Sequence, residues 1–397
     1  MIHRDLYLQR IKPFVNQKLI KMLTGQRRVG KSYILQLLAE EIKNNFADAN
    51  IIYIDKEKYE FDYMKTHLEL MEYINTQKTQ GMNYVFIDEV QDIEGFERVL
   101  RSLHNENNFD LYCTGSNAKV FSSELATFLS GRQISFHIGS LNFKEFCLFQ
   151  NLEPNNETLF KYLKIGGMPY LMHLPDDDKI RFEYLNNICS TILFRDVVNR
   201  HQIRDSRFLN DLLKYIADNT GSIFSANKIS VYLKNQKINK NVSLILDYLS
   251  HIEDAFFINK VQRTDIQGKK HFEIGEKYYF EDIGLRNSIV GFNQQDISKI
   301  IENIVYLHLR NCKYNVNIGM SENREIDFLA TKEGEKIYIQ VAYLISDEKV
   351  MEREFGNLLK IEDNYPKYVV SFEAFSAPNT YKGIKHITLK DFLLNFE

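Results

Sequence analysis

Short apolar runs that end in polar residues recur through the first third of the chain, and segments with helical periodicity separate most of them. Five runs have the length and the β-branched or aromatic content of buried strands: residues 18–23, 51–55, 84–89, 111–117 and 133–138. Strands that alternate with helices are typical of an α/β fold with a mostly parallel sheet, because parallel neighbours need a long crossover connection.

The loop after the first run, residues 25–32, fits the P-loop pattern G-x-x-x-x-G-K-[ST] completely. Its glycines let backbone N–H groups turn toward one anion, and the next helix adds partial positive charge at its N-terminus. In this pattern Lys31 reaches the β- and γ-phosphates and the Ser32 hydroxyl ligates Mg²⁺. A plain glycine turn is the alternative, but the strand–helix context argues against it. The predicted ATP-binding residues are Gly25, Gln26, Arg27, Arg28, Val29, Gly30, Lys31, Ser32 and Tyr33.

The third run ends in two carboxylates, Asp88 and Glu89. Because ligands collect at the carboxyl ends of parallel strands, we predict that Asp88 holds Mg²⁺ through water. Glu89 is then the catalytic base or orienter for the attacking water. Two solvated acids at a strand end are the alternative, and the complete P-loop upstream weighs against it.

Two further candidates lie on the fourth and fifth runs. Ser116, at the end of the fourth, can touch the γ-phosphate or its water, although a simple turn explains it equally well. Arg132 opens the fifth, and a guanidinium near the phosphates stabilises transition-state charge. Arg132 is therefore a candidate catalytic residue, in cis or from a neighbouring subunit, with a surface ion pair as the equal alternative.

Residues 151–206 predict a helical connector that is broken by Gly-Gly-Met-Pro at 166–169. Between 207 and 292, three helical stripes and two strand-like runs are typical of a winged helix-turn-helix. Its third helix presents four polar candidates for a DNA groove: Asn239, Lys240, Asn241 and Ser243. The segment is only mildly basic, so a lid or protein-interaction module is an equally good interpretation.

The last segment, 298–397, combines a helix with strands at 324–330 and 336–343, an order that resembles the PD-(D/E)xK nuclease fold. In that fold a helix Glu, a strand Asp and a (D/E/Q)-x-K strand together bind metal. The residues that match are Glu302, Asp327 and Gln340. Ala342 stands where the catalytic lysine belongs, and Lys349 is a weak substitute. We therefore predict a nuclease-like domain that is inactive and that serves as a nucleic-acid or partner binder.

Six motifs occur together in a characteristic order: residues 25–32, 86–89, 114–116, 131–132, 141–146 and 166–169. With them the whole chain resembles the bacterial and archaeal AAA-type ATPases of the AAA_14 group, in which a P-loop domain precedes a DUF4143 region. The resemblance implies a P-loop domain over 1–150 with an additional central strand, Mg-ATP as ligand, and a winged-helix region after it. Asn142 departs from the pattern, since many relatives carry proline there.

Charge and composition narrow the remaining choices. The net charge is −3, so any nucleic-acid contact has to come from a local patch. Cys113, Cys147, Cys189 and Cys312 have no paired spacing, which excludes a zinc ribbon, argues against a disulfide framework and fits a reducing cytosol. No signal-peptide pattern and no apolar run of membrane length occur, so we expect a cytoplasmic protein without a membrane partner.

These observations lead to one main hypothesis and two rivals. The main hypothesis is a Mg-dependent ATPase whose nucleotide state switches the winged-helix and nuclease-like modules. The rivals are a DNA-binding regulator that keeps ATP as a ligand with little turnover, and an ATP-dependent nuclease. A protein partner or a homo-oligomer fits any of the three, and the pathway and substrate stay open.

Overall fold

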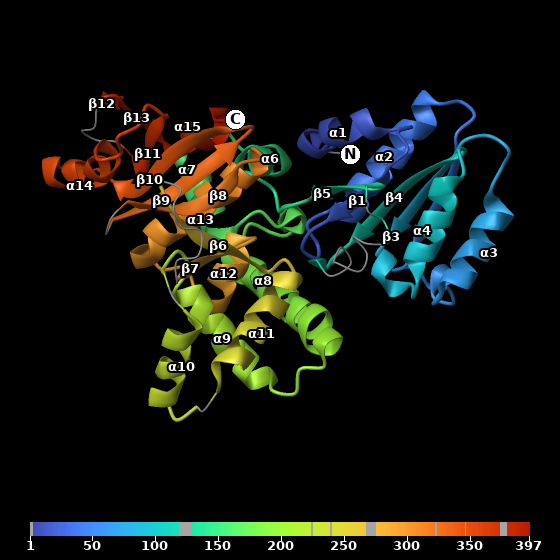
Figure 1. Cartoon of the computed structure of the whole chain (residues 1–397), viewed down its shortest axis with the longest axis horizontal. Helices are drawn as coiled ribbons and strands as arrows, with labels where there is room; N and C mark the ends of the chain where they lie inside the picture. Colours follow the sequence, from blue (N-terminus) through green and yellow to red (C-terminus); the bar gives the residue numbers. More distant parts are fainter. Residues whose placement is uncertain are drawn as a thin grey trace. The chain divides into compact units, whose positions relative to one another are not determined.

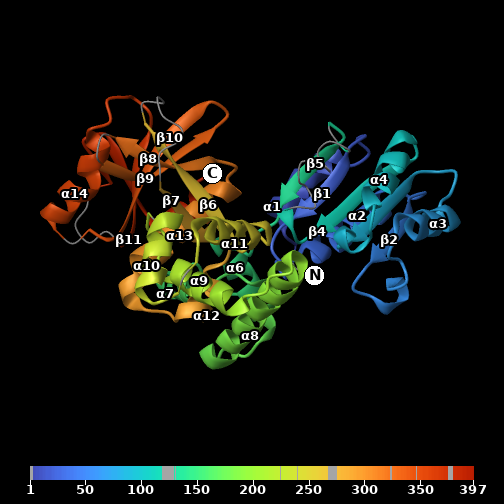
Figure 2. The same cartoon turned by 60° about the horizontal axis from the view of Figure 1, so that its bottom comes forward.

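The computed structural model describes most of the chain, namely residues 3–118, 129, 131–223, 225–238, 240–266, 275–321, 324–345, 347–373 and 379–397. Contacts divide the chain into two compact units. The first consists of Met1–Gly139 with Asp254–Phe256, and the second of Ser140–Glu253 with Phe257–Glu397. Figure 1 and Figure 2 label the elements of both units, and each unit is described by itself.

The first unit is built on a five-stranded sheet in the order β2-β3-β4-β1-β5, and the neighbouring strands are parallel. The strands are β1 (Ile20–Thr24), β2 (Asn50–Asp55), β3 (Asn83–Asp88), β4 (Phe109–Gly115) and β5 (Gln133–His137). Strand β4 lies between the strand that leads into the P-loop and the strand that ends in Asp88. The predicted α/β fold with a parallel sheet and an additional central strand is therefore confirmed.

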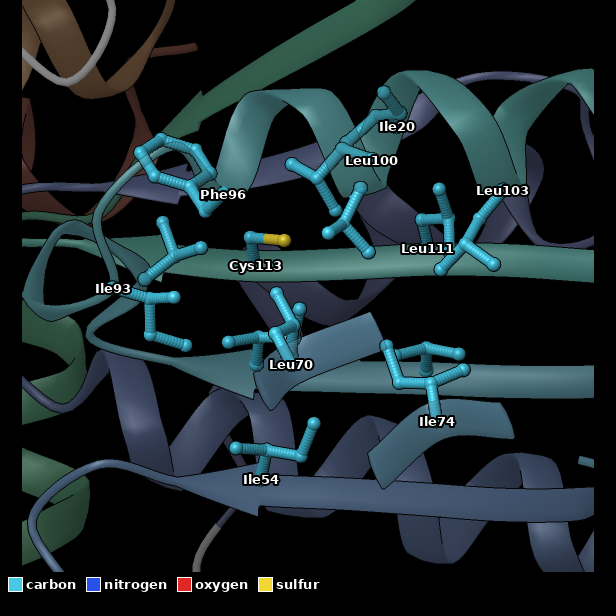
Figure 3. Close-up of a cluster of buried hydrophobic side chains, with 14 of the residues drawn as sticks. Ile20, Ile54, Leu70, Ile74, Ile93, Phe96, Leu100, Leu103, Leu111 and Cys113 are labelled. Carbon is cyan, nitrogen blue, oxygen red and sulfur yellow. The ribbon is translucent and has the colours of Figure 1, made fainter. Parts of the chain in front are cut away.

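Helices cover this sheet. They are α1 (Asp5–Ile11), α2 (Lys31–Asn45), α3 (His67–Gln77) and α4 (Phe96–Asn105), with the short turns η1 (Lys12–Phe14), η2 (Tyr59–Phe61) and η3 (Val90–Asp92). In Figure 3, Leu70 and Ile74 of α3 lie in the same apolar cluster as Leu100 and Leu103 of α4. Each such buried leucine contributes about 1.5–3 kcal/mol relative to an exposed one. This core holds the carboxyl ends of β3 and β4 in place.

The second unit contains an eight-stranded sheet in the order β12-β13-β11-β10-β9-β8-β6-β7. Its strands are β6 (Ile258–Asp265), β7 (Glu276–Phe280), β8 (Asn315–Ser321), β9 (Arg324–Lys332), β10 (Glu335–Leu344), β11 (Lys367–Glu373), β12 (Thr380–Tyr381) and β13 (Ile384–Thr388). The β6–β7 hairpin, which we expected in the winged-helix segment, continues this sheet because β6 pairs with β8. The division of the unit into connector, winged helix and nuclease-like domain stays a prediction.

The helices of the second unit follow the predicted order along the chain. They are α6 (Phe143–Gln150), α7 (Asn156–Ile165), η5 (Pro169–His173), α8 (Asp178–Thr191), the π-helix η6 (Ile192–Asn199), α9 (Ser206–Asp218), α10 (Ala226–Asn235), α11 (Val242–Asp254), α12 (Ile283–Val290), η7 (Gln294–Asp296), α13 (Ile297–Asn311), α14 (Glu348–Leu359) and α15 (Leu389–Asn395). Among the described residues, none of the helices combines the length and the apolar character needed to cross a membrane.

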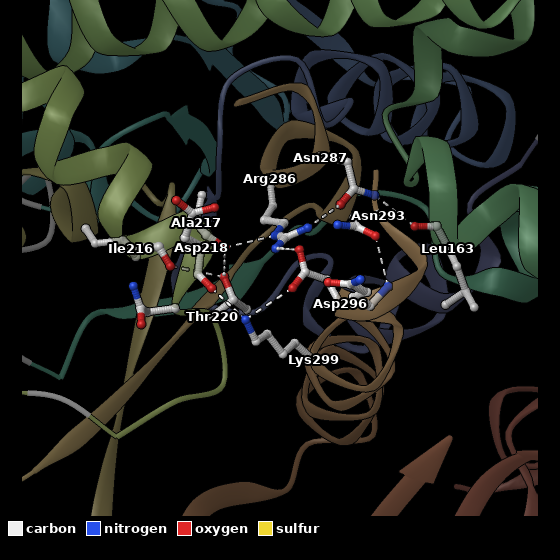
Figure 4. Close-up of polar contacts among 12 residues, drawn as sticks. Leu163, Ile216, Ala217, Asp218, Thr220, Arg286, Asn287, Asn293, Asp296 and Lys299 are labelled. Carbon is white, nitrogen blue, oxygen red and sulfur yellow. Dashed lines mark hydrogen bonds and ion pairs between the residues drawn. The ribbon is translucent and has the colours of Figure 1, made fainter. Parts of the chain in front are cut away.

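A buried arginine joins three of these helices. The Arg286 guanidinium of α12 donates to the carbonyl oxygen of Ala217 at 2.9 Å, in α9, and to the Asp296 carboxylate at 2.8 Å, in η7 (Figure 4). Its neighbour Asn287 donates to the Leu163 carbonyl oxygen of α7 at 3.0 Å. Because every group in this network has a partner, the buried charge orders the helices without a large desolvation penalty.

The Gly-Gly break in the connector reflects close packing of backbones. A Cβ atom on Gly167 would lie 2.1 Å from the Leu141 carbonyl oxygen. Gly166 has φ +73°, and a Cβ there would lie 2.4 Å from the backbone nitrogen of Gly284. The buried Asp282 carboxylate accepts hydrogen bonds from the backbone N–H groups of Gly167 and Leu285, at 2.8 and 3.1 Å. Glycine is needed here because no side chain fits between the two backbones.

We therefore expect Gly167→Ala to destabilise the protein by about 1–3 kcal/mol or more, the usual cost of overpacking. Gly356→Ala is the matched control, because a Cβ atom there meets nothing within 4 Å and the residue lies in α14. Thermal melting followed by circular dichroism measures both. Equal melting temperatures for the two variants would contradict the packing described above.

Candidate functional site

The P-loop backbone curls tightly against the segment that follows β5. Gly25 has φ +143°, and a Cβ atom on it would lie 2.1 Å from the Ile138 carbonyl oxygen. The Ile138 N–H in turn donates to the Thr24 carbonyl oxygen at 2.7 Å. Gly30, with φ +95°, is the N-cap of α2, so the helix begins at Lys31 and its free N–H groups face the loop. The loop and helix N-terminus thus have the geometry that binds phosphate groups in proteins.

Arg4, which precedes α1, and Tyr7 of α1 contact the P-loop and the segment after β5, and sequence reasoning missed both. The Arg4 guanidinium donates to the Val29 carbonyl oxygen at 2.8 Å and to the Gly139 carbonyl oxygen at 3.1 Å. The Tyr7 hydroxyl accepts from the Gly139 N–H at 3.0 Å, and its ring lies 4.6 Å from the Arg4 guanidinium. These contacts join residues far apart in sequence, so no local pattern indicates them.

The Lys31 ammonium lies under the loop. It donates to the carbonyl oxygens of Gly25 and Gln26, both at 3.0 Å, and lies 3.9 Å from the Glu89 carboxylate. Gln26 is fully buried, and neither polar atom of its amide has a hydrogen-bond partner in the described part of the chain. A buried ammonium and an orphaned amide beside a ring of backbone N–H groups fit a polyanionic ligand such as a nucleotide.

Asp88 and Ser32 meet at the end of β3. The Asp88 carboxylate accepts from the Thr114 hydroxyl of β4, and a Ser32 hydrogen bond also reaches it. Burial raises the pKa of Asp88 above its ordinary value, and these two hydrogen bonds only partly offset the effect. A buried carboxylate next to a hydroxyl is the oxygen ligand set that Mg²⁺ prefers. The predicted metal-binding pair therefore lies together and fits that ion.

Glu89 lies in a strained conformation next to Asp88. Its φ is +53°, a left-handed conformation that non-glycine residues adopt mainly where surrounding contacts enforce it. The Glu89 N–H donates to the Thr114 hydroxyl at 2.8 Å, and its carboxylate accepts from the Ser116 hydroxyl at 2.9 Å and from the Gln91 amide. Burial acts to raise the pKa of Glu89, but the charges of Lys31 and Arg27 outweigh it and lower the pKa. Glu89 is thus held ionised.

The three arginines of interest have different positions. Arg27 is buried, and its guanidinium lies 3.4 Å from the Glu57 carboxylate, whereas Arg28 is exposed. Arg132 does not lie where we expected it. Parallel pairing places Ile20 beside Gln133 and Thr24 beside His137, so Arg132 is at the amino end of the sheet. The P-loop follows the carboxyl end, which is five steps of about 3.3 Å, or about 17 Å, from Arg132.

The first unit therefore brings together most of the predicted site and adds residues that were not predicted. Those brought together around the carboxyl ends of β1, β3 and β4 are Gly25, Gln26, Arg27, Val29, Gly30, Lys31, Ser32, Asp88, Glu89 and Ser116. Arg28 belongs to the loop with its side chain in solvent, and Tyr33 is half-buried on α2. Thr114 and Gln91 are the additions. Thr114 is a polar residue at the end of a buried strand, a feature that could have indicated it. The sequence analysis included it in the 114–116 motif but named only Ser116 as a candidate.

The four candidates for DNA contact in the second unit differ in their surroundings. The Lys240 ammonium forms an ion pair with Asp205 at 2.5 Å, and Asn241 accepts from the Leu244 N–H at 2.8 Å at the start of α11. Ser243 is exposed. Asn239 lies outside the described residues. Lys240 and Asn241 therefore already have structural partners, which leaves them less available to a nucleic acid.

The nuclease-like residues of the second unit surround a lysine from another strand. The Lys277 ammonium of β7 is 2.7 Å from Glu302 and 2.6 Å from Glu325, and the Tyr279 hydroxyl donates to the same Glu302 oxygen. Burial raises the pKa of Asp327 well above its ordinary value, and the Glu302 charge adds to this. A cation of the chain itself thus pairs with Glu302, one of the two carboxylates that we matched to a metal site.

Comparison with known proteins supports an AAA-type domain in the first unit. Residues 17–147 match the family model AAA_14, described as an AAA domain. This match and the sheet order define a P-loop AAA-type domain. Residues 156–296 match a second model, described as a domain of unknown function, DUF8612. The resemblance had implied a DUF4143 region there, and that assignment stays a prediction.

Two relatives match along most of their length. An uncharacterized protein from Haemophilus influenzae is 33% identical, covering 99% of each chain. The uncharacterized protein MJ1544 from Methanocaldococcus jannaschii is 32% identical, covering 89% of this chain and 80% of its own. The chain belongs to the same protein family as these two.

Solved structures show more distant likenesses. The Aeropyrum pernix ORC1 protein in complex with DNA is 10% identical over 73% of this chain and 92% of its own, with a TM-score of 0.34. The replication initiator DnaA bound to AMPPCP and single-stranded DNA is 15% identical over 64% and 89%, also with a TM-score of 0.34.

The buried lysine of the second unit generates a stability prediction. Lys277→Met leaves Glu302 and Glu325 without their cation, so we expect a loss of about 3 kcal/mol, as for other broken buried ion pairs. Lys260→Met in the same hairpin removes a half-exposed ion pair with Glu276 and should cost at most about 1 kcal/mol. Urea unfolding of both variants measures the difference. An unchanged midpoint for Lys277→Met would show that the cation does not hold the cluster.

Proposed function

We propose that this protein binds Mg-ATP at the P-loop of its first unit and hydrolyses it to ADP and phosphate. The observation that carries the proposal is the Glu89 carboxylate, which is buried, held by the Ser116 hydroxyl at 2.9 Å and 3.9 Å from the Lys31 ammonium. A charged acceptor in a buried position beside a phosphate-binding loop suits the orientation of one water molecule.

Each residue of the site has a distinct role in the proposed binding and hydrolysis of ATP. Backbone N–H groups of the loop and the Lys31 ammonium bind the β- and γ-phosphates, so Lys31 exchanges the Gly25 and Gln26 carbonyl oxygens for phosphate oxygens. Asp88 and Ser32 would hold Mg²⁺, which when bound neutralises negative charge on the phosphate oxygens. Glu89 orients water for in-line attack and accepts its proton, while Thr114 holds both carboxylate residues at the strand end.

A wider role would involve the second unit. The nucleotide state of the first unit would bias the second unit, which could engage a protein partner or DNA through residues near Lys240, Asn241 and Ser243. Turnover rather than static ATP binding is favoured because Glu89 is kept ionised in a strained conformation, an arrangement that binding alone does not require. The position of the cation Lys277 disfavours a nuclease.

Phosphate release tests the proposal directly. Lys31→Ala should lose both the Mg-ATP-induced rise in melting temperature and turnover, because the Lys31 ammonium is the main positive charge that contacts the phosphates. Glu89→Gln should keep the rise in melting temperature and lose about 10²-fold or more in kcat, because general bases contribute that much. Glu94→Gln removes an exposed carboxylate five residues later and serves as control. Wild-type rates in both Lys31→Ala and Glu89→Gln would refute an ATPase at this site.

The raised pKa of Asp88 generates a pH prediction. Without ligand the folded chain keeps the Asp88 proton at a pH where the unfolded chain has lost it, and Mg²⁺ has to displace that proton. The Mg²⁺-dependent part of the ATP-induced rise in melting temperature should therefore shrink as pH falls toward the raised pKa of Asp88. Asp88→Asn should lose most of this pH dependence, and the slope that remains reports the titration of ATP itself. Identical slopes in wild type and Asp88→Asn would contradict the assignment.

A further inference from the structure

Gln91 lies on the short turn η3, which begins directly after Glu89. The Asp92 N–H donates to the Glu89 carbonyl oxygen at 3.0 Å, and the Ile93 N–H donates to the Val90 carbonyl oxygen at 3.1 Å. Val90 and Ile93 are buried in the apolar core of the first unit. Because the core holds the turn on both sides of Gln91, the backbone of Gln91 has a fixed position beside Glu89.

The amide nitrogen of Gln91 is directed at the Glu89 carboxylate. It donates to the same carboxylate oxygen that accepts from the Ser116 hydroxyl at 2.9 Å. An ionised carboxylate can only accept hydrogen bonds, so the nitrogen end of the amide has to face it. The carboxylate also lies 3.9 Å from the Lys31 ammonium. The Gln91 side chain thus lies at the phosphate-binding loop with its orientation fixed.

The oxygen end of the same amide is different. The atom is buried, and no group in the described part of the chain donates a hydrogen bond to it. A buried carbonyl oxygen without a donor is unfavourable, because it has lost the water that it bound in the unfolded chain. Such an oxygen calls for an explanation, and a water molecule or a ligand at the site is one that supplies the missing donor. The Gln91 amide oxygen is therefore suited to accept from a molecule that enters the site.

One water molecule can reach both acceptors. The nitrogen and oxygen of a single amide group are roughly 2.2 Å apart. Since the nitrogen is hydrogen-bonded to the Glu89 carboxylate, the Gln91 amide oxygen is at most about 5.2 Å from that carboxylate. A water molecule that donates at about 2.8 Å to each of two acceptors spans up to about 5.6 Å. A single water molecule can thus donate one hydrogen to Glu89 and the other to Gln91.

Hydrolysis makes use of such a pair of acceptors. The attacking water has to aim a lone pair at the γ-phosphorus, in line with the bond that breaks. A single acceptor fixes one O–H bond, and the water molecule can still rotate about it. A second acceptor fixes the other O–H bond and with it the direction of the lone pairs. Orientation of this kind is a large part of the rate that enzymes gain from positioning.

We propose that Gln91 is a catalytic residue whose amide oxygen accepts a hydrogen bond from the attacking water, together with Glu89. The inference rests on the proposed ATPase function and adds a second residue that contacts the water. In the step itself, the water oxygen bonds to the γ-phosphorus and one proton passes to Glu89. The other hydrogen, held by Gln91, stays on the phosphate. The bond from the γ-phosphorus to the β–γ bridging oxygen breaks, and the bond pair stays on ADP.

The first experiment measures steady-state phosphate release by Gln91→Met, which keeps a long unbranched side chain and removes both polar atoms of the amide. We expect kcat to fall by about 10²-fold while KM changes little, because the amide acts on the attacking water rather than on the bound nucleotide. Gln9→Met makes the same change at an exposed position of α1 and should keep the wild-type rate.

A second variant separates contact with water from the hydrogen bond to Glu89. Gln91→Lys keeps a donor for the Glu89 carboxylate but has no acceptor, so its kcat should stay about as low as that of Gln91→Met. Both variants should be slow even at the high-pH plateau of kcat, where Glu89 is ionised. Recovery of the wild-type plateau in Gln91→Lys would show that Gln91 only holds Glu89, and the inference would be wrong.

A further readout does not depend on turnover. ADP with aluminium fluoride mimics the transferring phosphoryl group, and it should raise the wild-type melting temperature beyond ADP alone. Gln91→Met should keep the rise caused by ADP and lose part of the additional rise, because the water that completes the mimic has lost one of its acceptors. Loss of the ADP effect itself would show a distorted site and would count against a role confined to the water.

Lys31→Ala distinguishes failure of this inference from failure of the proposed function. Wild-type phosphate release in Lys31→Ala would overturn the proposed function itself. An inactive Lys31→Ala together with a Gln91→Met that is as active as Gln9→Met would overturn only the role of Gln91.

Discussion

The arrangement of the first unit depends on one buried electrostatic contact, the Lys31 ammonium between the P-loop carbonyl oxygens and the Glu89 carboxylate. An ammonium removed from water needs such partners, because an uncompensated buried charge costs several kcal/mol. The contact exists only because β1 and β3 end at the same edge of the sheet, with β4 between them. The strand order therefore sets the distance between the P-loop and the Glu89 carboxylate.

Polar side chains from β4 stabilise this contact. Thr114 binds both Asp88 and the Glu89 backbone, and Ser116 binds the Glu89 carboxylate. Burial acts to raise the pKa of both neighbouring acids, but their net pKa shifts are opposite. The pKa of Asp88 is raised because burial outweighs its hydrogen bonds, whereas Lys31 and Arg27 lower the pKa of Glu89. Two adjacent carboxyl groups are thereby suited to different tasks, one to exchange a proton for a cation and one to remain a charged acceptor.

The second unit uses buried charge for structure. Arg286 and Lys277 each connect elements from distant parts of the chain, and both have carboxylate partners within 2.8 Å. Lys277 contacts Glu302, one of the carboxylates that resembled a nuclease site, so its ammonium supplies positive charge to that carboxylate. A buried lysine thus has a different environment in each unit. Lys31 of the first unit contacts the P-loop, whereas Lys277 of the second unit contacts carboxylates.

Local patterns in the sequence determined the P-loop, the carboxylates at the end of β3 and the parallel α/β sheet, because strand period, glycine positions and motif spacing act over a few residues. The additional strand came from the family resemblance, and sheet pairing confirmed it. Only the tertiary structure decided which charges face the site. Pairing register moved Arg132 to the far end of the sheet, and backbone direction turned Arg27 inward and Arg28 outward. Contacts such as Arg4 with Val29 and Lys277 with Glu302 join residues 25 positions apart, where no periodicity extends.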